Sequence, residues 1–86
     1  MNTREHGIDS KWLTRRVSLG EAIRENMHGG IPFGHANEDW ERLLAKMEPG
    51  DELSYFEPPS ENSMRLWGLA LVRGEEVIST VITAVD

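Results

Sequence analysis

The chain has 86 residues, of which 38% are hydrophobic and 28% are charged, and its formal net charge is −6. This length predicts one small domain over residues 1–86, and the apolar content excludes a fully disordered chain. The sequence contains no cysteine, which excludes disulfides, thiolate metal sites and a cysteine nucleophile.

The N-terminal residues and the length of the apolar stretches indicate where in the cell the protein is found. Residues 1–10 lack the apolar core of a signal peptide, and no apolar stretch approaches the roughly 20 residues that span a bilayer. Together with the absence of cysteine, this predicts a cytoplasmic protein with no membrane partner. Residues 1–9 show no apolar periodicity, so we expect a flexible tail there.

The charge is unevenly distributed along the chain. Residues 1–36 carry five basic and four acidic side chains, for a net charge of +1, whereas residues 37–86 carry four basic and eleven acidic ones, for −7. An acidic surface repels phosphate backbones, so we expect no nucleic-acid partner. It suits a basic protein partner, although acidity also simply keeps a small protein in solution.

The first regular segment is ambiguous, and the second predicts a helix. Residues 11–17 fit either a strand or an early helical turn, because so short a segment has no decisive periodicity. Ser18 and Glu21 have the spacing of a capping box, which predicts a helix over 19–28. His28 would then lie in its last turn, with Gly29 and Gly30 ending it.

Residues 29–37 predict a loop, and a second helix follows it. Asn37 is a favourable N-cap residue. The helix after it carries an apolar stripe at i, i+3, i+4 and i+7, formed by Trp40, Leu43, Leu44 and Met47. Pro49 and Gly50 end this helix.

Residues 51–57 predict a strand with Leu53 and Tyr55 on one face and Phe56 on the other. Because Pro58 and Pro59 cannot donate ladder hydrogen bonds, we expect the end of this strand to lie at a sheet edge.

The last 21 residues predict a hairpin that turns at residues 73–76. Its expected register pairs Val72 with Val77, Leu71 with Ile78, Leu69 with Thr80 and Trp67 with Ile82. The opposite face is half apolar and carries Ala70, Val72, Val77, Ser79 and Val81. We expect that face to be covered by the N-terminal segment or by a second copy, which predicts a homodimer through the hairpin sheet.

These elements predict an α+β fold, in which two helices pack on a three-stranded antiparallel sheet that ends in the C-terminal β-hairpin. If residues 11–17 form a strand, the sheet gains a fourth member.

Two histidines beside the predicted glycine loop carry the candidate chemistry. His28, His35 and Glu38 are the candidate metal ligands, because two imidazoles and a carboxylate can hold zinc, although their spacing crosses a flexible loop. His35 beside Asp39 is the candidate general base. The alternatives are a helix-terminal cation at His28 and a solvent-exposed loop histidine at His35, and we expect neither a cofactor nor a bound metal.

Two further groups are candidate binding residues. Trp12, Arg15 and Arg16 combine residue types that are frequent at interface hot spots. Asp51, Glu52 and Glu57 flank the predicted edge strand, where a basic protein segment could add as a further strand. Alternatively, these carboxylates keep the edge from aggregating.

One resemblance covers roughly the last 40 residues. The segments Gly50-Asp51-Glu52-Leu53, Tyr55-Phe56, Pro58-Pro59 and residues 69–78 (LALVRGEEVI) resemble short bacterial proteins of unassigned function. The resemblance implies a bacterial source and no mechanism.

The sequence therefore predicts a small acidic, non-enzymatic protein-interaction module of the inhibitor, immunity or regulatory type. The alternative is a ligand-binding domain or small enzyme that uses the loop between His28 and Asp39. A deep pocket that contains His35 and a carboxylate would favour this alternative, whereas a flat surface there would exclude it.

Overall fold

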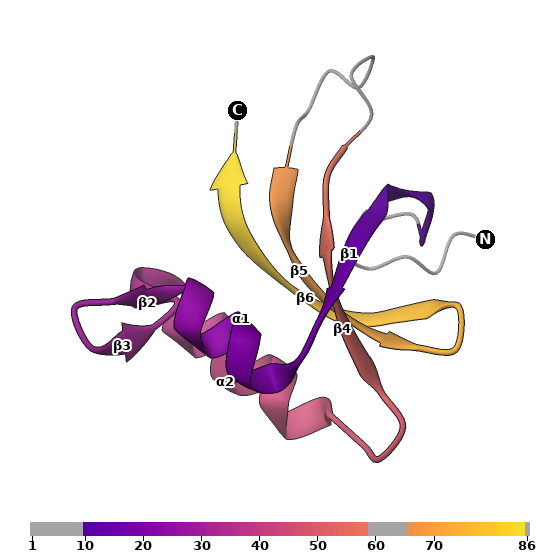
Figure 1. Ribbon diagram of the computed structural model, residues 1–86, viewed down its shortest axis with the longest axis horizontal. Coiled ribbons are helices and arrows are strands. Elements are labelled where there is room, and N and C mark those ends of the chain that lie inside the picture. Colours follow the sequence, from indigo (N-terminus) through magenta and orange to yellow (C-terminus); the bar gives the residue numbers. More distant parts are fainter. Residues whose placement is uncertain (1–9, 59–65, 86) are drawn as a thin grey trace.

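A computed structural model describes residues 10–58 and 66–85 (Figure 1), so the predicted flexible tail over residues 1–9 lies outside the described residues. In chain order the elements are η1 (Ser10–Trp12), β1 (Leu13–Val17), α1 (Leu19–Glu25), β2 (Met27–His28), β3 (Ile31–Pro32), η2 (Gly34–Ala36), α2 (Asn37–Lys46), β4 (Glu52–Phe56), β5 (Leu66–Arg73) and β6 (Glu76–Val85). The predicted α+β class is confirmed. In these described ranges, neither helix has the length and apolar character needed to cross a membrane.

The main sheet has four antiparallel strands in the order β1-β4-β5-β6, and β2 pairs with β3 in a separate hairpin. The ambiguous segment 11–17 therefore supplies a strand, which pairs with β4 and buries Val17. The prediction that residues 51–57 form an edge is wrong, because β4 lies between β1 and β5. Pro58 lies two residues beyond Phe56, the last residue of β4, so its missing N–H removes no hydrogen bond from either ladder.

Helix α1 begins as predicted but ends early. The Ser18 hydroxyl accepts from the Glu21 amide at 3.1 Å, and the Glu21 carboxylate accepts from the Ser18 amide at 2.9 Å, which completes the capping box. The helix ends at Glu25 rather than at residue 28. The chain then turns sharply at Gly29 and Gly30, whose φ angles of 59° and 82° suit a two-residue hairpin turn. These glycines therefore join β2 to β3 and do not end the helix.

Helix α2 begins without the predicted side-chain cap. The 3-10 helix η2 leads directly into α2, so backbone carbonyls accept the first amides, as Gly34 does for Asn37. The Asn37 side chain instead donates to the Pro32 carbonyl at 2.9 Å and holds β3 against the start of α2. On the predicted stripe, Trp40 and Leu43 are buried.

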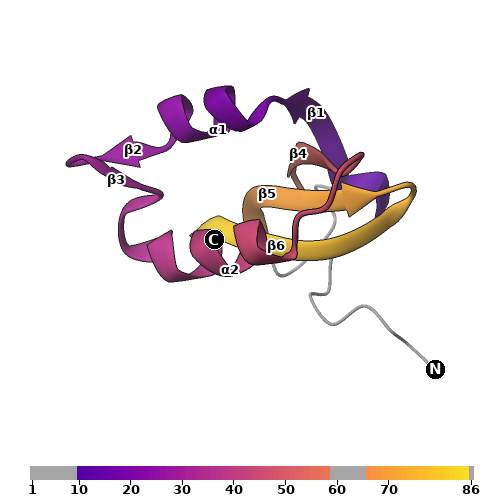
Figure 2. The same ribbon diagram turned by 90° about the horizontal axis from the view of Figure 1, so that it is seen from below.

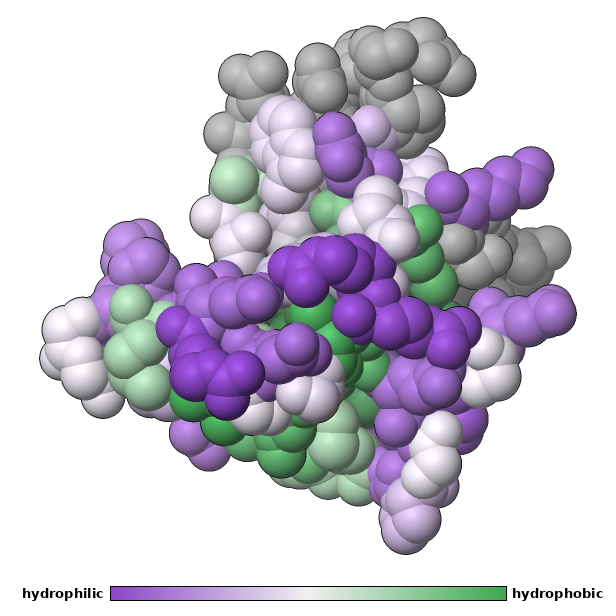
Figure 3. Space-filling model, viewed as in Figure 1, coloured by the Kyte–Doolittle hydropathy of each residue, from purple (hydrophilic) through white to green (hydrophobic). Residues whose placement is uncertain are grey.

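The main core lies on the face of the sheet that carries both helices. Its buried members are Val17, Ala22, Phe33, Trp40, Leu43, Leu53, Leu69, Leu71 and Val81. In Figure 2, α1 lies next to β1 and α2 next to β6, and the β2–β3 hairpin links the two helices at the end farthest from β1. Figure 3 shows hydrophilic side chains covering α1, with hydrophobic surface emerging beneath it along α2.

Strands β5 and β6 pair as predicted only near their turn. Val72 faces Val77, but the register then shifts so that Leu71 faces Ser79 and Ile78 becomes the extra residue of a β-bulge. Beyond the bulge, each residue of β6 therefore lies on the opposite face of the sheet from the one that the predicted register gave it. Val81 therefore enters the main core opposite Leu69 (the sequence had placed it on the other face), and Ile82 leaves that face.

The second face of the sheet is also buried within the single chain. Phe56, Ala70 and Val72 are at most 2% exposed, and Trp12 and Leu13 pack beside them. This burial fits the expectation that the chain's own N-terminal segment covers part of the face. These three residues are thus buried without a second copy, and the homodimer stays a prediction.

Because β5 approaches β6 closely at Gly68, we expect a methyl group added at this position to destabilise the fold. In Gly68→Ala, the added Cβ would overlap the Val81 carbonyl oxygen and lie 3.0 Å from Phe56 Cζ. We expect a loss of about 1–3 kcal/mol in the free energy of unfolding, measured by urea titration. Gly20→Ala is the matched control, because its Cβ meets only Arg24 Nη1 at 3.5 Å. Equal stabilities of the two variants would contradict this account.

Candidate functional site

A pocket of about 270 Å³ lies where the β2–β3 hairpin, η2 and β6 meet. Its lining residues are Asn26, His28, Phe33, Gly34, His35, Ala36, Ile82 and Thr83. The pocket thus joins the two predicted histidines to residues near the end of β6, which lie about 50 positions later in the sequence. A mixed lining of apolar walls and a few polar groups is typical of small-molecule sites.

The β2–β3 hairpin places His28 on the pocket wall. His28 pairs with Ile31 across the two-residue turn, and Met27 pairs with Pro32. A Cβ added to Gly34 would lie 3.2 Å from the Cβ of His28, a tight contact that favours glycine where the two segments meet. The φ angle of 54° at Gly34 adds a second reason, because side chains disfavour that conformation.

Phe33 holds the loop in a strained conformation beside the pocket. Its φ of 65° makes it the only non-glycine residue with positive φ among those the structure describes. Strain of this kind costs about 1–3 kcal/mol and tends to occur at functional sites. The Phe33 side chain is buried and stacks on Trp40 with 4.5 Å between ring centroids, and its amide donates to the Asn26 carbonyl at 2.6 Å. These contacts anchor the loop on α2 and on the end of α1.

The two histidines share the pocket, but the predicted carboxylates do not line it. Asp39 pairs with Arg42 at 2.6 Å on the exposed side of α2, so it does not orient His35 as a general base. Glu38 is exposed, and the described ranges contain no group of three or more side chains suited to hold a metal ion. The structure therefore brings together His28 and His35, without the third ligand that a zinc site needs.

Thr83 comes to the pocket through a second bulge in β6. Gly68 faces Ile82 and Trp67 faces Ala84, which leaves Thr83 as the extra residue. The Thr83 hydroxyl donates to the Trp67 carbonyl at 3.2 Å. Bulges re-aim side chains in this way and are common near functional sites.

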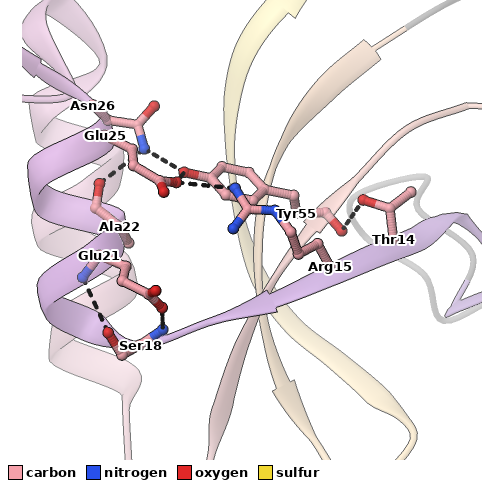
Figure 4. A network of polar contacts seen from close by, with 8 residues as sticks. All are labelled: Thr14, Arg15, Ser18, Glu21, Ala22, Glu25, Asn26 and Tyr55. Atoms are coloured by element: carbon pink, nitrogen blue, oxygen red, sulfur yellow. Dashed lines mark hydrogen bonds and ion pairs between the residues drawn. The ribbon is translucent and has the colours of Figure 1, made fainter.

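A polar network fixes Asn26, which lines the pocket at the end of α1 (Figure 4). The Asn26 Nδ2 donates to the Ala22 carbonyl at 2.8 Å and to the Tyr55 hydroxyl at 2.9 Å. The Tyr55 hydroxyl in turn donates to the Glu25 carboxylate at 2.8 Å, which also accepts from Arg15 at 3.0 Å. Through Tyr55, the network links the pocket wall to β4 in the centre of the sheet.

The protonation states of this network follow from the same contacts. The hydrogen bond from Tyr55, together with the guanidinium of Arg15, lowers the pKa of Glu25. Burial of the phenol, followed by its hydrogen bond to Glu25, raises the pKa of Tyr55 above its ordinary value near 10. At neutral pH, therefore, Glu25 accepts as a carboxylate and Tyr55 keeps the proton that it donates.

The six predicted binding residues do not form one surface. Arg15 belongs to the Tyr55 network and Trp12 is half-buried against the second face of the sheet. Arg16, Asp51 and Glu52 line a shallower depression of about 240 Å³ between β1 and the start of β4. Within it, Arg16 pairs with Glu52 at 2.6 Å. Glu57 is exposed, and its amide donates to the Trp12 carbonyl.

Asp51 is a structural residue rather than a free carboxylate. Its side chain is 1% exposed and accepts two hydrogen bonds from Arg73, both of 2.9 Å. It also accepts from the Glu48 amide at 2.8 Å, and Arg73 donates to the Lys46 carbonyl at 3.1 Å. This bidentate pair joins the end of α2 to β4 and β5.

Sequence reasoning missed four polar or special positions at the pocket: Asn26, Phe33, Gly34 and Thr83. Gly34 had a signal, because a glycine two residues after Pro32 predicts an unusual backbone. The other three had none, since Asn26 depends on Tyr55, Phe33 on Trp40, and Thr83 on a bulge that no local pattern encodes.

Comparison with family models, with curated proteins and with solved structures finds no match. The site is therefore interpreted from its own geometry.

The Asp51–Arg73 pair predicts a pH-dependent part of the stability. The hydrogen bonds from Arg73, and then the one from the Glu48 amide, lower the pKa of Asp51 from its ordinary value of 3.8. A lowered folded-state pKa contributes stability that is fully present above the ordinary pKa and is lost as the pH falls through the lowered one.

We expect Asp51→Asn to lower the free energy of unfolding at pH 7 and to flatten its decline between about pH 5 and pH 2. Urea titrations at a series of pH values measure this, with the exposed-turn variant Glu75→Gln as the control. An unchanged pH slope in Asp51→Asn would contradict the assignment.

Proposed function

We propose that this protein is a small-ligand-binding domain whose site is the pocket around His28 and His35. The observation that carries the proposal is this pocket of about 270 Å³, held open by the strained loop at Phe33. Its volume is close to the lower end of small-molecule sites, which begin near 300 Å³. A ligand of about ten non-hydrogen atoms suits it.

The proposal is one of binding without catalysis. A general base needs a group that orients it, and Asp39 is engaged by Arg42. In the described part of the chain, neither the His28 nor the His35 side chain takes part in a hydrogen bond or an ion pair. Both imidazoles are therefore available to a ligand as donors and as acceptors. A cytoplasmic location belongs to the same proposal, since the chain has no cysteine to stabilise it in an oxidising compartment.

The test is ligand titration against a variant with a filled pocket. In Thr83→Trp, an indole at the exposed rim occupies the pocket at little cost to the core, because Thr83 is exposed. Fragments of ten atoms that bind the wild type in the millimolar range should lose at least tenfold in affinity. Amide chemical shifts in NMR titrations measure the affinity.

Glu76→Trp is the matched control, because it adds the same indole near the other end of β6. It should leave fragment affinity unchanged. A fragment library that shifts no resonance of the pocket residues in the wild type would refute the proposed function.

A second candidate function is the protein-interaction module that the composition suggests. The observation that favours it is the outer edge of β1, because within the described ranges β1 pairs with β4 alone. Thr14, Arg15 and Arg16 are exposed there. A partner strand could add at this edge, and its side chains would meet two arginines rather than the carboxylates of β4.

A photocrosslinking residue tests this candidate in the cell of origin. With p-benzoylphenylalanine at Arg16, we expect one discrete crosslinked protein, and with the same residue at the exposed Glu75 we expect none. Identical patterns at the two positions would remove the support for strand addition at β1.

A further inference from the structure

The orientation of the Asn26 amide determines what the pocket can recognise. Asn26 has two amide protons, and both are used, by the Ala22 carbonyl and by the Tyr55 hydroxyl. Turning the amide over would place its oxygen against the Ala22 carbonyl, where two acceptors would face each other. The amide therefore has one satisfied orientation, and its Oδ1 points away from Ala22 and Tyr55 (Figure 4).

Tyr55 is held in a state that enforces this orientation. Its hydroxyl proton goes to Glu25, so toward Asn26 the phenol oxygen can only accept. Arg15 supports the arrangement, since it donates to the same Glu25 oxygen and its guanidinium lies 4.9 Å from the centre of the Tyr55 ring. The hydrogen bonds that connect Asn26 through Tyr55 to Glu25 thus each have a fixed direction.

The second fixed polar group of the pocket is also an acceptor. The Thr83 hydroxyl donates its single proton to the Trp67 carbonyl, which leaves its oxygen to accept from a ligand. Asn26 and Thr83 both line the pocket, and each keeps an acceptor oxygen after its protons are used. His28 and His35 complete the polar lining, and each neutral imidazole can donate from one ring nitrogen.

Charge argues against an anionic ligand. Among the described lining residues the basic side chains are the two histidines, with no lysine or arginine, and the chain as a whole carries −6. A carboxylate or phosphate group would meet the Asn26 and Thr83 oxygens with acceptors of its own, so no hydrogen bond could form between them. Phe33, Ala36 and Ile82 instead offer an apolar wall for a carbon skeleton.

We propose that the pocket selects a small neutral cyclic amide or urea, whose N–H groups donate to Asn26 Oδ1 and Thr83 Oγ1 and whose carbonyl accepts from an imidazole. This inference rests on the proposed ligand-binding function and specifies its ligand class. Asn26 and Thr83 contact the ligand, and Tyr55 is a positioning residue that acts through Asn26.

Three probes of the same shape test the selection in NMR titrations of the full chain. Benzimidazol-2-one has two N–H groups, oxindole has one, and indan-2-one replaces both with methylene groups. We expect affinity to fall by about tenfold or more from the first to the last, because an unmet buried acceptor is costly. Benzoate, an anion of similar size, should bind no better than indan-2-one.

Tyr55→Phe tests the positioning role through a ratio that does not depend on overall stability. Without the hydroxyl, the Asn26 amide is held by the Ala22 carbonyl alone and its Oδ1 is less precisely placed, so the ratio of the affinities for benzimidazol-2-one and indan-2-one should fall about fivefold or more. Thr14→Val is the matched control, because the Thr14 hydroxyl donates to the Tyr55 backbone carbonyl and not to its phenol. Its ratio should match that of the wild type.

The outcomes separate the two proposals. Equal binding of benzimidazol-2-one and indan-2-one, or preferred binding of benzoate, would overturn the selection for N–H donors and leave a ligand pocket in place. If no probe shifts the pocket resonances up to its solubility limit, the ligand-binding function itself is contradicted. If the wild type binds the three probes with graded affinity, the ligand class is supported. If the ratio of the affinities for benzimidazol-2-one and indan-2-one is unchanged in Tyr55→Phe, the positioning role of Tyr55 is overturned.

Discussion

The reversal of the chain at Phe33 is the constraint on which the helical half of the molecule depends. The backbone there takes a left-handed conformation that a phenylalanine disfavours by about 1–3 kcal/mol. Burial of the ring and its stacking on Trp40 offset that cost, since aromatic pairs contribute about 0.5–1.5 kcal/mol beyond their burial. Phe33 lies directly between β3 and η2, so this anchored turn leads the chain from the β2–β3 hairpin into η2 and α2.

Local chemistry made much of this fold predictable. The capping box at Ser18 and the apolar stripe led by Trp40 identified both helices, because each feature is complete within one turn or one face. The hairpin turn at Gly74 was equally local, and the pairing of Val72 with Val77 followed from it. Elements fixed by neighbours in the sequence were therefore recovered.

What was missed depends on contacts between distant segments. The bulge at Ile78 reverses the two faces of β6, and no property of Ile78 distinguishes it from a regularly paired residue. The position of β4 inside the sheet depends on β1, a segment too short to assign by its own pattern. At the candidate site the two histidines were identified from the sequence, whereas Asn26 required knowledge of Tyr55, which lies 29 residues further along the chain.

Because of its two bulges, the number of residues in β6 determines which side chains lie in the core and at the pocket, as well as how the strand pairs. The two bulges divide β6 into short runs, and each run presents alternate residues to the helices. Removing one residue between Ser79 and Ile82 would exchange those faces, withdrawing Val81 from the core and shifting Ile82 from the pocket wall. Natural variants of this chain should therefore accept insertions in the turn at Gly74 far more readily than in β6, and strand length becomes a marker for a preserved pocket.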